Sequence, residues 1–332
     1  MNKVTFLITN GCNFKCKHCF VSAGERIQNE LTHEEKFLAI DKLQKLGVNK
    51  ITFSGGEPLI ERHIFEYVTY TKNKNLQVGF LTNGLLLDEQ KIEFLTSNVD
   101  SLSISLYTND ILDLPNEIYE NYFEKTITNL KRLTKLNYPF KVTIPISVEN
   151  QTILEKLIQR LYDENINPKA VRVYMITPVG RGGKNKAICT ENLNCSKLID
   201  KLPTHLKNSN LNISAEYSSI SEEEKEDRRF FTKCPMQEYS STNYINQFAD
   251  PHMDSNGDLY LCGLVLKNKE FCVGNILQDS AEKIIENIES LSNRLKSQTK
   301  ADCCPALNRL VDKGKCLVCP VVYIKKEEKE ND

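Results

Sequence analysis

The chain has 332 residues, of which 40% are hydrophobic and 26% are charged, values typical of a globular protein with one large domain and a smaller one. Its formal net charge of −1 provides no general attraction to nucleic acid, and no apolar run approaches the roughly 20 residues that span a bilayer. No signal peptide is recognisable, so we expect a cytoplasmic protein without nucleic-acid or membrane partners, in which 12 cysteines are more typical of metal ligands than of disulfides.

Strands and helices alternate from residue 3 to about residue 180. The run Thr32-His33-Glu34-Glu35 is a capping box that opens a helix, and Gly47 ends it. Six βα-type repeats predict parallel strands with helices outside, and six are too few to close an eight-fold barrel. We therefore expect an α/β fold, a partial (β/α)6 barrel. Its strands are predicted at 4–9, 50–54, 77–82, 101–107, 141–147 and 171–176, and its later helices at 62–72, 88–97, 117–136 and 152–165.

The alternation stops after Pro178. Residues 180–184 are predicted to be a flexible basic loop, residues 221–229 a solvated charge run, and residues 248–262 a hairpin that turns at Ser255-Asn256-Gly257. A helix is expected at about 281–296. The predicted domains are the barrel at 1–184, a linker or bridging region at 185–230, a small cysteine-rich α+β domain at 231–324 and a disordered charged tail at 325–332.

The first strand leads directly into three cysteines, Cys12, Cys16 and Cys19, with the spacing C-x3-C-x2-C. A disulfide would use two of them, whereas a structural zinc site normally takes four ligands. An iron–sulfur cube held by three thiolates keeps one iron open to another ligand. From the loop alone, chance clustering and a zinc site with His18 as the fourth ligand remain alternatives.

Polar residues and glycines follow later strands of the predicted barrel. The loop Ser54-Gly55-Gly56-Glu57-Pro58 combines glycines that permit close approach of a ligand with a carboxylate that can accept a cationic amine. Asn83 ends the third strand, and Ser103 and Ser105 share one side of the fourth. Because ligands in α/β barrels collect at the carboxyl ends of the strands, these groups are expected to face one cavity, although the serines could simply line the barrel interior.

The cysteine loop followed in register by Gly55-Gly56-Glu57 resembles the signature of the radical S-adenosylmethionine (SAM) superfamily. The resemblance implies that Cys12, Cys16 and Cys19 bind a [4Fe-4S] cluster whose open iron is chelated by SAM. It also implies a set of contacts to SAM, in which the Gly-Gly-Glu motif holds the amino group and Phe20 packs on the adenine. The remaining SAM or substrate contacts are Pro58, Asn83, Ser103, Ser105, and Arg172 or Arg181.

The C-terminal cysteines resemble the SPASM extension of this superfamily. Gly257-Asp258-Leu259-Tyr260-Leu261-Cys262 matches its G-x4-C element, but no cysteine follows Cys319, so the match implies a shortened, twitch-type extension with one auxiliary [4Fe-4S] cluster. The implied ligands are Cys234, Cys262, Cys316 and Cys319, and Cys303 or Cys304 could replace Cys234. If enough of the other cysteines join, a second auxiliary cluster becomes possible. Because a thiol S–H can quench a carbon radical, Cys189, Cys195 and Cys272 are candidate hydrogen donors.

The resemblance implies reductive cleavage of SAM to a 5′-deoxyadenosyl radical that abstracts hydrogen from a substrate carbon. Members with such extensions often crosslink, epimerise or oxidise ribosomally made peptides, so we expect a peptide-modifying oxidoreductase. The alternatives are a small-molecule dehydrogenase, an enzyme of a cofactor or haem pathway and, more distantly, a non-catalytic metal-binding protein. The expected partners are an electron donor such as flavodoxin or ferredoxin and the substrate. Because the chain begins with the first barrel strand, a peptide substrate would need either a separate peptide-recognition protein or direct binding of its leader by the barrel.

Overall fold

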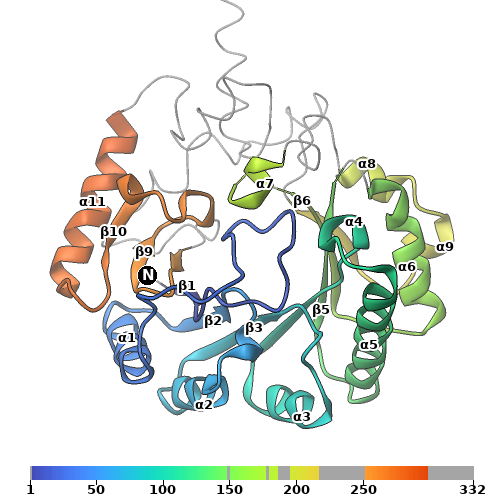
Figure 1. Ribbon diagram of the computed structural model, residues 1–332, viewed down its shortest axis with the longest axis horizontal. Coiled ribbons are helices and arrows are strands. Elements are labelled where there is room, and N and C mark those ends of the chain that lie inside the picture. The colour runs from blue at the N-terminus through green and yellow to red at the C-terminus, as the bar shows by residue number, and fades with distance from the viewer. Residues whose placement is uncertain (1, 148–149, 177–178, 186–194, 217–250, 298–332) are drawn as a thin grey trace, which may run out of the picture. The chain divides into compact units, whose positions relative to one another are not determined.

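The computed structural model describes residues 2–147, 150–176, 179–185, 195–216 and 251–297 (Figure 1). Within this part, the chain is an α/β protein that divides into two compact units. Of the described residues, the first unit contains 2–12, 24–78 and 251–297, and the second contains 13–23 and those between 79 and 216. The boundary between the units therefore falls within the cysteine loop: Cys12 belongs to the first unit, and Cys16 and Cys19 belong to the second.

The first unit is built around β1 (Lys3–Leu7), which pairs in parallel with β2 (Lys50–Ser54) on one side and with β8 (His252–Met253) on the other. An antiparallel hairpin connects β8 to β9 (Asp258–Tyr260), and β10 (Cys272–Asn275) continues the sheet. The α-helices in the described part of this unit are α1 (His33–Lys45), α2 (Ile64–Asn73) and α11 (Ala281–Ser297), which packs along β10 (Figure 1).

Local sequence signals explain the start and end of α1. The Thr32 hydroxyl accepts a hydrogen bond from the Glu35 amide, and the Glu35 carboxylate accepts one from the Thr32 amide, which is the predicted capping box. Gly47 follows with φ +82°, a conformation that glycine adopts without steric cost. The helix buries Ile40 and Leu43, and the sheet buries Phe6 and Phe53, all with no exposed surface.

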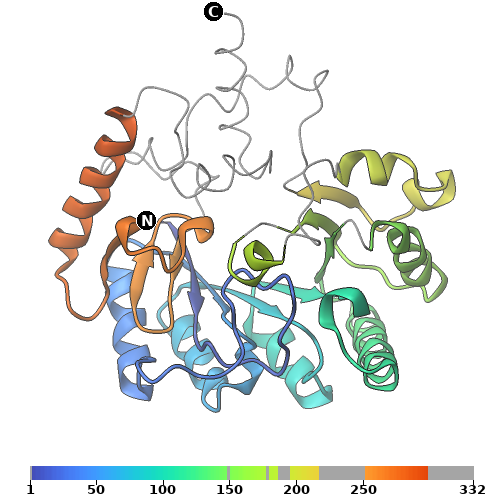
Figure 2. The same cartoon turned by 45° about the horizontal axis from the view of Figure 1, so that its top comes forward.

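The second unit contains five parallel strands in chain order. They are β3 (Gln77–Thr82, from Gly79 onward), β4 (Ser101–Ser105), β5 (Lys141–Ile146), β6 (Ala170–Met175) and β7 (Ile213–Glu216). The longer helices α5 (Asn116–Lys135) and α6 (Leu154–Asp163) lie along one side of these strands (Figure 2). The other helices are α3 (Glu89–Asn98), α4 (Asn109–Leu112), α7 (Arg181–Lys184), α8 (Cys195–Asp200) and α9 (Thr204–Lys207).

Alternation of side chains gives the strands of the second unit two different faces. Leu102, Ile104 and Val142 are completely buried, whereas Ser103 and Ser105 between them are half-buried. The apolar face is therefore the one covered by helices, and the opposite face carries the polar groups.

The structure confirms the six predicted barrel strands, the hairpin after residue 250 and the last helix. The expectation of a flexible basic loop at 180–184 is wrong, because Arg181–Lys184 forms the short helix α7. Residues 195–216, assigned to the linker, form α8, α9 and β7, and α4 was not anticipated. The domain boundaries stay a prediction, and the charge run and the C-terminal tail lie outside the described residues. None of the helices that could be examined is both long and apolar enough to cross a membrane.

Candidate active site

The stem of the cysteine loop is closed inside the first unit. Gly11 and Gly24 form a parallel bridge, the Cys12 amide donates to the Gly24 carbonyl at 2.7 Å, and the Gly24 amide donates to the Asn10 carbonyl at 2.9 Å. The backbone at Cys12 is therefore fixed by main-chain hydrogen bonds.

The two glycines of the Gly-Gly-Glu motif pack directly on this stem. A Cβ atom on Gly55 would lie 2.4 Å from the Thr9 carbonyl oxygen, and one on Gly56 would lie 1.9 Å from the Gly11 carbonyl oxygen. The amides of Gly56 and Glu57 donate to the same two carbonyls, at 2.8 and 2.9 Å. The glycines were expected to admit a ligand, and the structure adds an internal reason for them, which is the contact between two backbone segments.

Glu57 is buried to 1% exposure at the start of the 3-10 helix Pro58–Ile60. Its Oε1 accepts a hydrogen bond from the Leu59 amide at 3.1 Å, and Pro58 occupies a helical position that requires no amide donor. The carboxylate is thus oriented by the turn that follows it, next to the segment that carries Cys12.

A buried ionic network that the sequence did not reveal follows Glu57. The Lys36 ammonium lies 2.9 Å and the Arg26 guanidinium 3.0 Å from Glu61, and Lys36 and Glu61 are only 3% and 5% exposed. Burial alone would raise the pKa of Glu61, but the hydrogen bond from Lys36 and the positive charges of Lys36 and Arg26 lower it. Glu61 is consequently a carboxylate at neutral pH that ties α1 to the segment after Glu57.

Glu30 adds a second anchor on the loop stem. Its carboxylate accepts hydrogen bonds from the Thr9 hydroxyl at 3.0 Å and from the Asn10 amide at 2.5 Å. These charge-assisted bonds hold the end of β1 at the point where the cysteine loop begins.

In the second unit, the middle of the cysteine loop is anchored by a buried aromatic side chain. Phe14 is 5% exposed and makes an edge-to-face contact with Tyr122, with ring centroids 5.1 Å apart. The Lys17 amide donates to the Ile111 carbonyl at 2.9 Å, so the unanticipated helix α4 also supports the loop. The Ala23 amide donates to the Cys19 sulfur at 3.3 Å, the kind of contact that stabilises a thiolate ligand.

Arg181 makes its contacts with the backbone of this loop. Its Nε donates to the Cys16 carbonyl at 2.8 Å, one terminal nitrogen donates to the Ala23 carbonyl at 2.5 Å, and its own amide donates to the Cys19 carbonyl at 3.0 Å. Gly180 has φ +62°, and a Cβ atom there would lie 2.2 Å from the Phe20 carbonyl oxygen. We call Gly180 and Arg181 the loop clasp. The sequence suggested Arg181 as a contact to SAM or substrate and did not reveal that it holds the backbone of the cysteine loop.

His18 lies between the two cysteines of this unit. Burial and, secondarily, the positive charge of Arg181 lower the pKa of His18 to about 3, so the imidazole is neutral. Its ring packs against Tyr107 at 5.2 Å between centroids, and its Nδ1 is buried without a hydrogen-bond partner. Burial raises the pKa of Tyr107 well above its ordinary value, and nearby Tyr174 and Cys16 add to the shift.

The predicted polar groups of the strand ends lie on the less buried face of the second unit's sheet. Ser105 pairs in register with Thr143, with hydroxyl oxygens 3.2 Å apart, and Thr143 pairs in register with Arg172. Ser103 lies two residues earlier on the same face. The structure thus brings Ser103, Ser105 and Arg172 together on one surface.

Asn83 and Phe20 have different surroundings. The amide nitrogen of Asn83 donates to the Asn13 side chain at 2.9 Å, and its amide oxygen accepts from the Leu85 amide at 3.0 Å, so Asn83 ties the end of β3 to the cysteine loop. The Phe20 side chain is 36% exposed and remains accessible to a ligand.

Of the expected auxiliary-cluster ligands, only Cys262 lies in the described residues. It is half-buried two residues after β9, directly in front of the 3-10 turn Gly263–Val265. Cys272 begins β10, and burial raises the pKa of its thiol. Cys195 is the first residue of α8. The expected ligands or donors outside the described residues are Cys189, Cys234, Cys303, Cys304, Cys316 and Cys319.

The donor set of the cysteine loop fits an iron–sulfur cluster. Its candidate ligands are thiols, an amide already donates to the Cys19 sulfur, and the buried, unsatisfied Nδ1 of His18 belongs to a residue between Cys16 and Cys19 in the sequence. His18 packs on Tyr107, and this contact gives the imidazole a structural role that does not require the zinc ligation considered as the alternative. Three thiolates from one short loop are typical of a cluster with one open iron.

Comparison with known proteins agrees with this chemistry. Residues 6–161 match the family model of the radical SAM superfamily. Among curated proteins, the chain is 29% identical over 194 residues to the AdoMet-dependent heme synthase of Methanosarcina barkeri, covering 56% of this chain and 53% of that protein. It is 25% identical over 158 residues to the sporulation killing factor maturation protein SkfB of Bacillus subtilis, covering 47% and 38%. A GTP 3′,8-cyclase of Clostridium botulinum is 25% identical over 312 residues, covering 89% and 90%.

Solved structures show that the fold is shared over nearly the whole chain. Streptococcus suis SuiB bound to the precursor peptide SuiA matches with a TM-score of 0.67 and 14% identity, covering 96% of this chain and 75% of SuiB. The structure of anSMEcpe with bound AdoMet matches with a TM-score of 0.62 and 16% identity, covering 95% and 88%. The chain spans about half the length of the heme synthase and less of SkfB. The predicted fold is confirmed, and the chain contains a radical SAM domain at residues 6–161, in agreement with the predicted family.

Proposed function

We propose that this radical SAM enzyme modifies a ribosomally synthesised peptide. The observation that carries the proposal is the fold shared with SuiB, whose structure contains its precursor peptide, over 96% of this chain. The similarity to the maturation protein SkfB supports the same class. A crosslink, an epimerisation or an oxidation of the peptide are the reactions that we expect.

The residues that would hold the cluster are Cys12, Cys16 and Cys19. The amino group of SAM would be held by the loop of Gly55, Gly56, Glu57 and Pro58. The polar face with Ser103, Ser105 and Arg172 would receive the rest of SAM. Phe20 would lie beside the adenine, and Asn83 would lie at the adjoining strand end. When bound, the cluster and SAM supply a radical that abstracts hydrogen from carbon. The part played by this chain is to position both groups through the buried Glu57, the loop stem and the loop clasp.

An auxiliary [4Fe-4S] cluster, with Cys262 among its ligands and Cys234, Cys316 and Cys319 as the others, is part of the proposal. Cys272 is a candidate hydrogen donor because burial raises the pKa of its thiol, which keeps the S–H bond intact at neutral pH. Electrons would come from a flavodoxin or ferredoxin, and a separate recognition protein would present the peptide. Replacing Cys272 with alanine should change the product, and an unchanged product would remove this residue from the mechanism.

The cluster assignment is tested anaerobically with the reconstituted wild type and the Cys12→Ala/Cys16→Ala/Cys19→Ala variant. We expect about eight irons in the wild type and about four in the variant, with 5′-deoxyadenosine formed from SAM and dithionite by the wild type only. An iron content near zero in the variant would argue against the auxiliary cluster, and zinc without deoxyadenosine would overturn the enzyme assignment.

A small-molecule substrate is the second candidate, because a heme synthase and a GTP 3′,8-cyclase are among the similar proteins. Deuterium labelling separates the two candidates. The enzyme is incubated with SAM and either a deuterated peptide encoded by a short reading frame beside its gene, a deuterated porphyrin or deuterated GTP. Deuterium that appears in 5′-deoxyadenosine identifies the hydrogen-donating substrate, and a peptide that gives none while the porphyrin or GTP does would refute peptide modification.

A further inference from the structure

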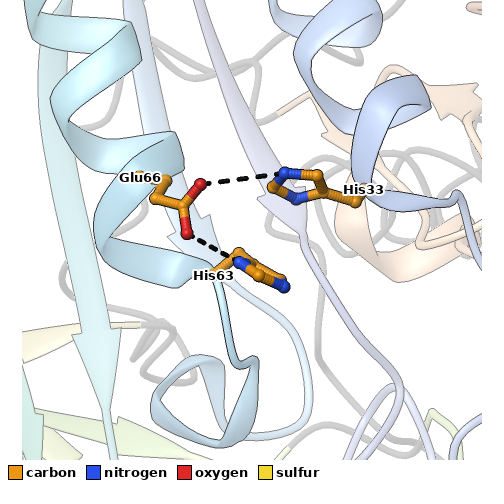
Figure 3. Close-up of side chains that lie close together, drawn as sticks. All are labelled: His33, His63 and Glu66. Atoms are coloured by element: carbon orange, nitrogen blue, oxygen red, sulfur yellow. Dashed lines mark hydrogen bonds and ion pairs between the residues drawn. The ribbon is translucent and has the colours of Figure 1, made fainter.

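The side chains of two histidines and one glutamate lie close together within the first unit. None of the three belongs to the cysteine loop. His33 is the first residue of α1, His63 is the N-cap residue of α2, and Glu66 is in the first turn of α2. Figure 3 shows that each carboxylate oxygen of Glu66 faces a different imidazole. The distances are 2.6 Å from Oε1 to His63 Nδ1 and 3.7 Å from Oε2 to His33 Nε2.

We propose that His33, His63 and Glu66 form a binding site for a divalent transition metal ion, of which Zn²⁺ is the best candidate. One nitrogen of each histidine and one carboxylate oxygen lie within 4.8 Å of one another. Bonds of about 2.0–2.2 Å in tetrahedral geometry place two ligand atoms of the same zinc ion ~3.3 Å apart. The separations of the Glu66 oxygens from His63 and His33 lie on either side of that value, and the two imidazoles lie within the 4.8 Å limit, so modest side-chain rotations would bring the three groups to ligand distances.

The residue behind His33 orients its imidazole for this task. The Tyr67 hydroxyl lies 2.9 Å from His33 Nδ1, and Tyr67 itself is completely buried. When Nδ1–H donates to this hydroxyl oxygen, Nε2 carries the lone pair and faces Glu66. A second partner that fixes the tautomer of a ligating histidine is the usual arrangement in protein metal sites.

Charge and exposure are also suitable. The Glu66 side chain is exposed, and an exposed glutamate is a carboxylate at neutral pH, as a metal ligand must be. The side chains of His33 and His63 are about one-third exposed, at 33% and 32%. The ion can therefore enter from solvent, and water can complete its coordination. Two imidazoles and one carboxylate are a ligand set that suits zinc, nickel and copper better than magnesium or calcium.

The site would connect two elements of the proposed SAM-binding half. His63 follows the 3-10 turn that begins after Glu57, and His33 opens the helix that contributes Lys36 to Glu61. A metal bound only by the folded state stabilises it by mass action. Zinc should therefore stabilise the connection between α1 and α2 without taking part in radical chemistry.

The test is a titration of the untagged, cluster-loaded full-length protein with zinc chloride under anaerobic conditions. Wild type is compared with Glu66→Gln and with the His33→Asn/His63→Asn variant, while His205→Asn removes an exposed imidazole of α9 as the matched control. Isothermal titration calorimetry should show one tight zinc equivalent fewer in the double variant than in the wild type, and no loss in the His205 control. Zinc bound by other cysteines contributes equally to all variants.

Two further measurements do not depend on enzymatic activity. Zinc should raise the melting temperature of the wild type reversibly with EDTA and leave that of the double variant unchanged. Tyr67→Phe, which keeps the ring but removes the hydroxyl behind His33, should weaken zinc binding about tenfold. Equal zinc stoichiometry and affinity in the wild type and in both ligand variants would overturn the proposal, as would an equal loss in His205→Asn. Because Glu66 is exposed, Glu66→Gln gives this answer even if the double variant folds poorly.

Discussion

Replacement of Arg181 by alanine should loosen the part of the cysteine loop that carries Cys16 and Cys19. The guanidinium donates to two loop carbonyls, at 2.8 and 2.5 Å. Hydrogen bonds from charged donors contribute about 1.5–3 kcal/mol each, and we take the lower value because Arg181 is only half-buried and water can replace it. Loss of both bonds then costs about 3 kcal/mol. That is a factor of roughly one hundred in the equilibrium between the closed and opened loop.

Hydrogen–deuterium exchange measures this opening directly. The amides of Lys17 and Cys19 are hydrogen-bonded within the second unit, to Ile111 and Cys16, and should exchange about one hundred times faster in Arg181→Ala. Iron should also be lost faster to a chelator. Arg181→Lys should give an intermediate result, because one ammonium group cannot reproduce the fork of donors.

The control is Lys184→Ala, which removes a positive charge from the exposed end of the same short helix. Its exchange rates should equal those of the wild type. Loop amides that exchange at wild-type rates in Arg181→Ala would refute the clasp. A fully normal Arg181→Lys variant would show that charge, and not the geometry of the guanidinium, is what matters.

Three other substitutions test the contacts around the site. Gly180→Ala should speed exchange of the same loop amides, because the new Cβ atom would lie 2.2 Å from the Phe20 carbonyl at positive φ; unchanged exchange would contradict that contact. Gly56→Ala should lower the free energy of unfolding by about 3 kcal/mol in urea denaturation, since its Cβ atom would lie 1.9 Å from the Gly11 carbonyl, and a wild-type value would show that the two segments do not touch. Lys36→Met should cost about 3–5 kcal/mol by leaving the buried Glu61 with less compensation, and adding Glu61→Gln should restore part of it. Because the folded-state pKa of Glu61 is lowered, its stabilising effect is complete above the unfolded pKa of about 4.5 and is lost as the pH falls through the folded value, so the destabilisation by Lys36→Met should shrink in acid.

The barrel elements could be predicted because each has a local signal. The capping box at Thr32 and the alternation of Ser103 and Ser105 with buried Leu102 and Ile104 are visible in short windows of sequence. The cysteine spacing and the Gly-Gly-Glu motif are equally local. These signals were sufficient for the fold class and for the family.

The elements that were missed depend on contacts between distant residues. Residues 180–184, which comprise the helix Arg181–Lys184 and its N-cap, include three glycines, a composition that predicts a loop. The helix is held by bonds from Arg181 to carbonyls more than 150 residues earlier. Glu61 and Lys36 are 25 residues apart, and neither lies in a motif. The proposed metal ligands His33, His63 and Glu66 are likewise brought together only by the packing of α1 against α2, which no local motif indicates.

The contacts that shape the cysteine loop act mainly on its backbone. Cys12 is fixed through its amide, Cys16 and Cys19 through their carbonyls, and the stem through the close approach of Gly55 and Gly56. It follows that the positions of the candidate ligands are encoded largely outside the C-x3-C-x2-C motif. The motif supplies the thiolates, and Gly56, Gly180 and Arg181 supply the conformation in which the thiolates can bind a cluster.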